Sequence, residues 1–410
     1  MTVQIATPDA SIVRRTFAAL HHRDFRIFWI GQLISVTGTW MQSVAQGWLV
    51  LQLTGSPFLL GVAVAARSLP VLILGLPSGV VADRFDRRRI IIATSCVATA
   101  TSAVLAWLTL TGRVDFGIVI VLSIVVGCAN ALEMPARQSL VVELAGPRHI
   151  ANAIALNSLL FNGARVVGPA FAGLVVAAFG TGWAFAINAV SFVPVIAGLV
   201  LISPVSADRR LTATRGAFVE LVAYLRSETR ITALLALLAI QTVFASGHLI
   251  IGPAVARDLG VGAEGLGFLL AATGVGAVVA GLRLAAYPDI VGRWRVMAAA
   301  GLLLAAALVG VPLVGGFGLT LVCFGAAGLS MVTFNASANT IIQSIVESRL
   351  RGRVMSLYTI VQLGIMPAGS LLSGALADRF GAANSLGIGG VLWAVTVVIA
   401  FAAIRELRTL

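Results

Sequence analysis

Long apolar segments separated by short polar connectors run through the whole chain. About twelve of them reach the roughly 20 residues that an α-helix needs to cross the hydrocarbon core of a bilayer. They span residues 25–52, 57–82, 90–110, 116–136, 151–179, 183–202, 231–256, 264–286, 294–314, 318–340, 353–378 and 384–404. Because that core contains no water, each segment must satisfy its backbone hydrogen bonds internally. The pattern predicts an all-α polytopic membrane protein with about 12 transmembrane helices.

The composition agrees with this pattern and excludes a soluble globular protein. Of the 410 residues, 59% are hydrophobic and 11% are charged, and the mean hydropathy is +1.01. A soluble domain is about half apolar and about a quarter charged. The net charge of +12 comes from arginines that are scattered over the connectors without one contiguous stripe. We therefore expect the lipid bilayer, and no nucleic acid, as a partner.

The arginines are distributed unequally between the two sets of connectors. Positive charge is retained on the cytoplasmic side of membrane proteins. The two ends of the chain and the connectors after the second, fourth, sixth, eighth and tenth segments hold 23 of the 28 arginines. The opposite connectors hold three, Arg113, Arg257 and Arg379. The sequence therefore predicts that both termini are cytoplasmic.

The longest connector divides the predicted helices into two sets of six. Within it, apolar residues recur at helical spacing between Phe218 and Leu225, which predicts an amphipathic helix on the inner membrane surface. We expect three parts: an N-terminal six-helix bundle over residues 1–202, a cytoplasmic linker over 203–230 and a C-terminal six-helix bundle over 231–410.

The connector after the second segment carries the densest charge of the chain. It lies in the stretch GVVADRFDRRRI, residues 79–90. The stretch resembles the loop signature GxxxDRxGRR of the major facilitator superfamily, with matches at Gly79, Asp83, Arg84, Arg87 and Arg88. Asp86 stands where that signature usually has glycine.

This resemblance implies a gating role for the loop. In the superfamily such an acid lies against the start of the eleventh helix, here near Arg353, and Arg137 is then an ion-pair partner for Asp83. An acid in that place accepts hydrogen bonds from the first amides of a helix and interacts with its positive dipole end. Shifted by 206 residues, Asp83 falls on Asp289 in a second, related loop. The alternative is a plain positive loop on the inner side, which an arginine cluster alone explains.

The fifth segment contains a second signature, in the string NGARVVGPAFAG. Glycines at this spacing flatten one face of a helix so that another helix approaches closely, and proline permits a kink. The string resembles the antiporter signature GPxxGG of drug exporters in the superfamily. The residues that carry it are Gly163, Gly168, Pro169 and Gly173, with Gly173 one position late. Packing glycines without influence on transport direction are an equal alternative.

Few ionisable residues lie inside the apolar segments. A charge at the bilayer centre costs from about 3 kcal/mol upward unless it faces a cavity or a partner. Arg67 and Arg165 are candidates for charge compensation, and Glu133 is the candidate coupling acid. Glu133 lies four residues before Arg137, so a local ion pair explains it equally well. His248 is more simply explained as a core histidine.

Neutral polar residues share faces on two segments. On the first, Gln32, Thr39 and Gln42 follow three- and four-residue steps near Trp40, and Ser35, Ser43 and Gln46 continue this polar face. Asn335 and Asn339 do the same on the tenth segment. Such faces either hold helices together or line a water-filled cavity. We expect Gln32, Thr39, Trp40, Gln42, Asn335 and Asn339 to line a cavity.

Further strings resemble one bacterial branch of the superfamily, the drug and siderophore exporters that include macrolide efflux proteins and the enterobactin exporter. They are the first segment from Phe25 to Pro57, the run EMPARQSL after the fourth, and RLRGRVMSLY before the eleventh. The resemblance implies a multi-pass protein of the bacterial cytoplasmic (inner) membrane, functional as a monomer. Its expected activity is secondary active transport by alternating access, with proton-coupled efflux of a small amphipathic compound.

No motif in the sequence supports an enzyme, a metal site or a cofactor. The GxxxxGKS phosphate loop and the HExxH and GxSxG motifs are absent, so the chain has no ATP-hydrolysing part of its own. The resemblance implies a proton gradient as the energy source. The three cysteines lie in apolar segments without metal-ligand spacing. Two alternatives stay open: a uniporter or importer of a small metabolite on the same fold, and a membrane receptor or scaffold that transports nothing.

Overall fold

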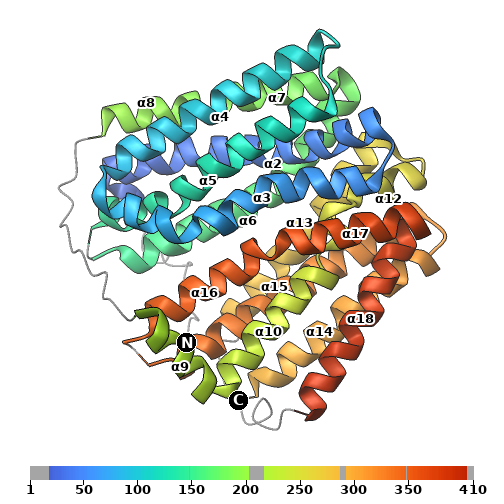
Figure 1. The fold of residues 1–410 in the computed structure, drawn as a ribbon. Helices are drawn as coiled ribbons and strands as arrows, with labels where there is room; N and C mark the ends of the chain where they lie inside the picture. The colour runs from blue at the N-terminus through green and yellow to red at the C-terminus, as the bar shows by residue number, and fades with distance from the viewer. Residues whose placement is uncertain (1–17, 147, 203–216, 287–291, 348, 404–410) are drawn as a thin grey trace, which may run out of the picture.

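A computed structural model describes residues 18–146, 148–202, 217–286, 292–347 and 349–403 (Figure 1). Helices make up nearly all of these residues. The first group consists of η1 (Ala18–His21), α2 (Arg23–Thr54), α3 (Pro57–Arg84), α4 (Arg87–Leu110), α5 (Phe116–Ala145), α6 (Ile150–Phe179), α7 (Thr181–Ser191) and α8 (Val193–Leu201). The second consists of α9 (Ala217–Ser227), α10 (Thr229–Phe244), α11 (Gly247–Ile250), α12 (Gly252–Asp258), α13 (Gly262–Ala286), α14 (Arg293–Leu313), α15 (Phe317–Ile345), α16 (Arg351–Gly364), α17 (Met366–Phe380) and α18 (Ala382–Ala403).

Each of the predicted apolar segments is helical, which confirms the all-α fold class. Ten stretches in the described part of the chain are long and apolar enough to cross a membrane. α2 has the length, but its glutamines, serines and threonines lower its hydropathy. The segment predicted at 231–256 is divided among α10, α11 and α12. The number of twelve crossings and the cytoplasmic termini stay predictions.

Three segments that were expected to be continuous are broken next to a proline. Proline has no backbone N–H and its ring clashes with the carbonyl four residues earlier, so an α-helix bends or stops there. The breaks lie at Phe192 before Pro194, at Ile251 before Pro253, and at Ile365 before Pro367. Each proline occupies the first turn of the new helix, where its missing N–H costs nothing.

Most contacts lie within two groups of helices, α2–α8, drawn in blue to green, and α9–α18, drawn in yellow-green to red (Figure 1). In the first group α2 packs on α6, α7 and α8, α3 on α5, and α4 on α5 and α7. In the second, α15 packs on α13 and α14, and α18 on α14 and α17. Two pairs make the main contacts between the groups, α3 with α17 and α6 with α13. The predicted division at 203–230 stays a prediction, because residues 203–216 lie outside the described residues.

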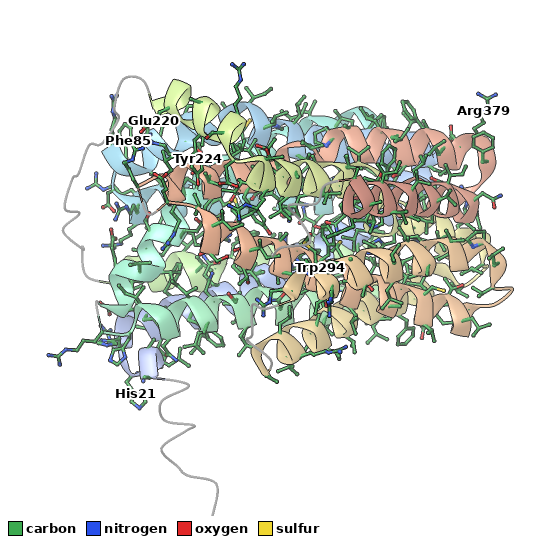
Figure 2. The ribbon with its side chains drawn as sticks, turned by 90° about the horizontal axis from the view of Figure 1, so that it is seen from below. His21, Phe85, Glu220, Tyr224, Trp294 and Arg379 are labelled. Atoms are coloured by element: carbon green, nitrogen blue, oxygen red, sulfur yellow. The ribbon has the colours of Figure 1, made fainter. Side chains whose placement is uncertain are left out.

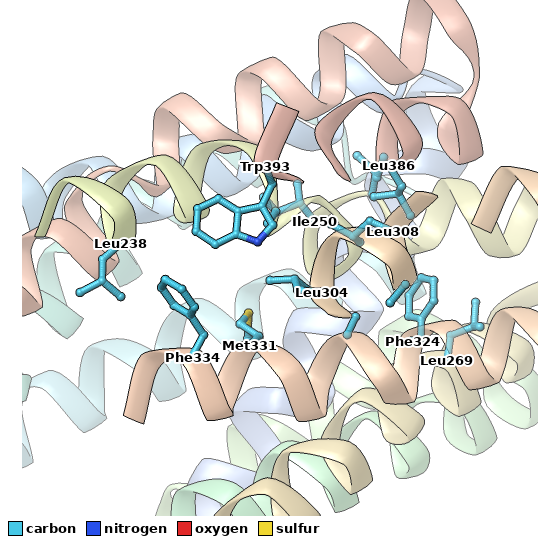
Figure 3. Close-up of a cluster of buried hydrophobic side chains, with 14 of the residues drawn as sticks. Leu238, Ile250, Leu269, Leu304, Leu308, Phe324, Met331, Phe334, Leu386 and Trp393 are labelled. Atoms are coloured by element: carbon cyan, nitrogen blue, oxygen red, sulfur yellow. The ribbon is translucent and has the colours of Figure 1, made fainter. Parts of the chain in front are cut away.

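An aromatic cluster fills the second group (Figure 3). Trp393 on α18 is fully buried, and its ring meets that of Phe334 on α15 edge to face, with 5.2 Å between centroids. The indole Nε1 donates a hydrogen bond of 2.9 Å to the carbonyl oxygen of Gly301 on α14. One side chain therefore joins three helices and satisfies its polar atom, as a buried tryptophan must.

The two ends of the molecule carry different side chains. Figure 2 shows His21, Phe85, Glu220 and Tyr224 at one end and Arg379 at the other. The first end corresponds to the connectors that the arginine distribution places in the cytoplasm, and we call it the inner end. The opposite end, where α2 meets α3 and α17 meets α18, is called the outer end.

Candidate functional site

A cavity of about 370 Å³ lies between the two groups of helices. This volume is within the usual range for small-molecule sites. α2, α3, α5 and α6 line it from one side, and α11, α12, α13, α16 and α17 from the other. The polar lining residues are Ser43, Gln46, Arg67, Ser68, Asn130, Arg165 and Thr273. Most other lining residues are aliphatic, so the cavity suits a compound with an apolar body and a few polar groups.

At the outer end, α3 and α17 are in backbone contact. A Cβ atom added at Gly61 would lie 2.3 Å from the carbonyl oxygen of Ser370. One added at Gly374 would lie 2.7 Å from the carbonyl oxygen of Pro57. Real Cβ contacts are not that short, so only glycine permits this approach.

The second contact between the groups, α6 with α13, is equally close. A Cβ atom at Gly267 would lie 2.7 Å from Cα of Gly173, and one at Gly274 would lie 2.8 Å from Cα of Val166. Gly168 instead lets α2 approach α6, since its Cβ would lie 2.5 Å from Cβ of Trp40. Gly168 and Gly173, predicted from the antiporter-like string, are thus both at helix contacts.

Toward the inner end the same helices diverge. No described residue comes within 4 Å of a Cβ atom added at Gly75 or Gly79 on α3, at Gly163 on α6, or at Gly281 on α13. The close contacts that α3 makes at residues 57–61 and α6 makes at residue 173 therefore do not continue toward the inner end of these helices. Figure 1 shows the same arrangement, in which the two groups form a V that is closed at the outer end and open at the inner end.

Arg67 and Arg165 both line the cavity, as expected of ionisable residues inside membrane segments. Arg67 Nη1 donates a hydrogen bond of 3.0 Å to Ser43 Oγ. The guanidinium carbon of Arg165 lies 5.2 Å from the centroid of the Trp40 ring, a cation–π contact. The Nε atom of Arg165 is buried and has no hydrogen-bond partner in the described part of the chain. Pro169, one turn beyond Arg165, also lines the cavity.

Glu133 and Arg137 form the local ion pair that their spacing allowed. Arg137 Nη1 lies 3.2 Å from Glu133 Oε1, and both side chains are mostly buried. The guanidinium of Arg137 also lies over the Phe161 ring at 4.5 Å. Asn130 and Met134 on the same helix line the cavity, which places the pair beside its inner mouth.

The prediction that Gln42 lines the cavity needs correction. Its Oε1 accepts hydrogen bonds from Ser102 Oγ at 2.7 Å and from Asn188 Nδ2 at 2.6 Å. Gln42 is 5% exposed and ties α2 to α4 and α7 inside the first group. The face of α2 that points at the cavity carries Trp40, Ser43 and Gln46 instead. A helix with polar residues on several sides presents only one of them to a given neighbour.

Four other predicted lining residues also lie outside the cavity wall, while Trp40 is part of it. Gln32 is 3% exposed, and the Thr39 hydroxyl donates to the carbonyl oxygen of Ser35 one turn earlier, at 2.9 Å. Asn335 accepts a hydrogen bond at its carbonyl oxygen from the hydroxyl of Tyr358, and Asn339 Oδ1 accepts one from Gln343. The contact to Asn335 is made by its backbone, and its side-chain Oδ1 is buried without a partner among the described residues.

The predicted gating loop is shorter than the sequence suggested, because α3 continues to Arg84 and α4 begins at Arg87. Asp86 caps α4: its carboxylate accepts a hydrogen bond of 2.9 Å from the Arg88 amide. That role explains an aspartate where the signature has glycine. The side chain of Asp83 lies outside the described residues, as does Asp289.

The arginines of this loop bind within their own group. Arg87 forms an ion pair with Glu143 near the end of α5. Arg88 Nη2 donates a hydrogen bond of 2.9 Å to the carbonyl oxygen of Val200 on α8. Arg84 is exposed. Arg137, the expected partner of Asp83, is paired with Glu133 here.

Asp378 was missed in the sequence, although it joins the two groups at the outer end. The Ser56 hydroxyl donates to its two carboxylate oxygens at 3.0 and 3.2 Å, and the Phe58 amide donates at 3.4 Å. Arg257 Nη1 donates a hydrogen bond of 2.8 Å to the carbonyl oxygen of Gly55 in the same turn. A signal was present: the string ADRF occurs at 82–85 and again at 377–380.

At the inner end, the linker helix α9 is tied to the second group. Glu220 accepts hydrogen bonds from Arg353 and Arg349, and Leu221 and Leu225 pack against the hydrophobic core. The hydrogen bond from Arg353 and the two positive charges hold the pKa of Glu220 below its ordinary value. α9 therefore packs against the second group, and its predicted place on the inner membrane surface stays a prediction.

Two linked groups of membrane-length helices around a central cavity define a polytopic membrane transporter. The chain belongs to the transmembrane secretion effector family of the major facilitator superfamily, whose profile matches residues 14–409. It is a multi-pass protein of the bacterial inner membrane, and it is not an enzyme.

Relatives in this family are efflux and siderophore transporters. The chain is 24% identical to the staphyloferrin A transporter of Staphylococcus aureus, over 93% of this chain and 97% of that protein. It is 27% identical to the multidrug efflux pump Tap of Mycolicibacterium fortuitum, over 85% and 88%. It is 23% identical to macrolide efflux protein A of Streptococcus pyogenes, over 94% and 97%.

Solved structures share the fold at low sequence identity. The crystal structure of a D-xylose–proton symporter matches with a TM-score of 0.73 and 16% identity, over 94% of this chain and 99% of that one. A bacterial homologue of the lysosomal transporter Spinster, in an inward-facing and occupied conformation, matches with a TM-score of 0.72 and 16% identity, over 98% and 99%.

Proposed function

We propose that the protein exports a small amphipathic compound from the cell by alternating access, in exchange for protons. The observation that carries this proposal is the cavity between two groups of helices that touch at one end only. A site that is reached from one side at a time, between two bundles that rock against each other, is how transporters of this type work. The drug and siderophore names of the relatives support export and a cargo of that size.

The two ADRF strings are the proposed gates. In the conformation whose cavity opens at the inner end, Asp378 binds the α2–α3 turn at the outer end. In the opposite state, Asp83 takes the equivalent place against the start of α16, with Gly79, Arg84, Arg87 and Arg88 forming the rest of the loop. α3 and the helix pair α16–α17 then each carry an acid at their last turn that caps the first turn of the other.

Glu133 is the proposed coupling acid. Among the described residues, Glu133 is the carboxylate that lies beside the cavity mouth. Its partner Arg137 is free to move once the acid takes up a proton. Protonation removes the charge that holds the pair, so proton uptake and a rearrangement at the mouth are linked. Gln at this position mimics the protonated acid.

A transport assay tests export and coupling together. Strains lacking or overproducing the protein are compared for macrolide resistance and for siderophore release, and the purified protein is placed in liposomes with an imposed pH gradient. We expect flux that follows the gradient, and a Glu133→Gln variant whose flux ignores it. Flux indifferent to the gradient in the unaltered protein would remove proton exchange. Accumulation inside overproducing cells would replace export by import.

A further inference from the structure

We propose that the cavity selects anions, and that Arg67 and Arg165 bind carboxylate groups of the transported compound. The inference rests on the proposed function in one respect, that the cavity is the transport site. It adds the chemical class of the cargo, an amphipathic molecule with one or more carboxylates on an apolar body.

The charge in the cavity is uncompensated. Among the described residues that line it, Arg67 and Arg165 are the charged ones, and both are cations. Neither pairs with a carboxylate in the part of the chain that the structure describes. The other arginines of this region show the contrast, since Arg87 pairs with Glu143 and Arg137 with Glu133. A charge at membrane depth needs a partner or a cavity, so the contents of the cavity supply the missing counter-charge.

Both guanidinium groups, from Arg67 on α3 and Arg165 on α6, contact the cavity-facing side of α2. Arg67 binds the hydroxyl of Ser43, and Arg165 lies over the ring of Trp40. Trp40 and Ser43 are three residues apart, a spacing that puts Cβ atoms about 5–6 Å apart on one helix face. A single small molecule can therefore reach both cations.

Both arginines also keep donors for a ligand. The bond to Ser43 uses one Nη atom of Arg67, and the contact of Arg165 with Trp40 uses its flat face. Guanidinium donors in a fork match the two oxygens of a carboxylate. The buried Nε of Arg165, which has no partner among the described residues, is a donor of that fork.

The rest of the wall defines the other part of the cargo. Aliphatic side chains from both groups, such as Val64, Ile250 and Leu270, surround the polar patch. They favour an apolar body, while the two positive charges repel an organic cation of the same shape. Because residues of both groups line the site, a compound bound there contacts both groups as they rock.

Two dyes with the same ring system and opposite charge test this inference. Carboxyfluorescein is anionic and rhodamine 123 is cationic, and both are built on xanthene. Their binding to the purified protein in a neutral detergent is measured by fluorescence anisotropy. We expect carboxyfluorescein to bind at least tenfold more tightly than rhodamine 123, and Arg67→Gln and Arg165→Gln each to weaken it at least tenfold.

Control variants separate charge from folding. Arg113→Gln removes one positive charge from the exposed connector between α4 and α5 at the outer end, and it should leave the affinity for carboxyfluorescein unchanged. Arg67→Lys and Arg165→Lys keep the charge and should recover part of the affinity that glutamine loses. Elution from a sizing column and the melting temperature identify any variant that fails to fold, in which case the lysine variants and the dye preference of the unaltered protein decide.

The outcomes distinguish this inference from the proposed function. Equal or tighter binding of rhodamine 123, binding of neither dye, or unchanged affinity in both glutamine variants would overturn anion selectivity. Liposomes that move rhodamine 123 along a pH gradient and ignore carboxyfluorescein would also overturn it and leave export intact. Carboxyfluorescein that binds through both arginines but is never moved would preserve the anion site and remove export.

Discussion

The carboxylate of Asp378 accepts a hydrogen bond from the Ser56 hydroxyl at 3.0 Å, across 322 positions of the chain. It is one of the few polar contacts that join the two groups of helices at the outer end, together with the bond from Arg257 to Gly55. The pair is exposed, so its contribution to overall stability is small. Its effect is expected on the balance between two conformations, where a small free energy matters.

Asp378→Asn should shift that balance toward an open outer end. Loss of the negative charge weakens the bonds from Ser56 and the Phe58 amide by about 1 kcal/mol, which changes the ratio of the two states by roughly fivefold. Double electron–electron resonance between spin labels at Leu53 and Phe380, both exposed, should show a longer distance between the two labels.

Asp115→Asn is the matched control for this change. Asp115 caps α5 through the Ile118 amide at 3.0 Å, a contact inside the first group. Its loss removes an exposed acid without touching the boundary between groups, so the label distance should not change. An Asp378→Asn variant with the distances of the unaltered protein would contradict the outer gate.

Valine in place of two different glycines of α13 should have different effects on the melting temperature. Gly267→Val places a side chain against Cα of Gly173, where a Cβ has only 2.7 Å, and overpacking of this kind costs about 1–3 kcal/mol. Gly281→Val enters open space and should leave the melting temperature unchanged or slightly raised, since glycine is a poor helix former. In transport, however, Gly281→Val should reduce flux, because an added side chain hinders closure of the inner mouth. Equal melting temperatures for the two variants would contradict the V-shaped arrangement.

Gln42→Leu should lower stability without altering ligand preference. The change removes the acceptor of the Ser102 hydroxyl and leaves the Asn188 amide with only the longer bond of 3.3 Å to Ser102 Oγ, at a cost of about 1–3 kcal/mol. Thr39→Val is the control, because that hydroxyl bonds only its own helix. Thermal unfolding measures both, and a change of ligand affinity in Gln42→Leu with an unchanged melting temperature would return Gln42 to the cavity wall.

Acid should release α9 from the second group. The folded-state pKa of Glu220 is depressed by Arg353 and Arg349, so the contact contributes stability above the unfolded pKa of about 4.3 and loses it as the pH falls through the folded value. A nitroxide label at the exposed Ala223 should become more mobile below that pH, and Glu220→Gln should show the mobile spectrum at neutral pH. An immobile label in Glu220→Gln at pH 7 would show that Leu221 and Leu225 hold α9 without the ion pair.

The apolar periodicity was sufficient to predict the helices, because membrane segments must be long and continuous in hydropathy. The breaks before Pro194, Pro253 and Pro367 were not predicted, since proline also occurs inside unbroken helices here, as Pro70 does in α3. Only the packing around a proline decides between a kink and a stop.

The site was predicted in part for a similar reason. Spacing alone indicated the pair Glu133 and Arg137, because residues four apart meet on any helix. Glu220 and Arg353 lie 133 positions apart, and no local pattern could join them. On α2 the sequence identified polar side chains but not the helix that each one faces, so Gln42 was placed in the cavity while Ser43 became the partner of Arg67.

The contact of Arg165 with Trp40 gives the protein an optical reporter of its own. An indole under a guanidinium emits differently from one whose cation has been drawn away by a bound anion. The chain has seven tryptophans, and Trp40 is the one that lines the cavity. A Trp40→Phe variant therefore identifies its share of the emission, and occupancy of the site can be followed in unlabelled protein while the cargo is still unknown.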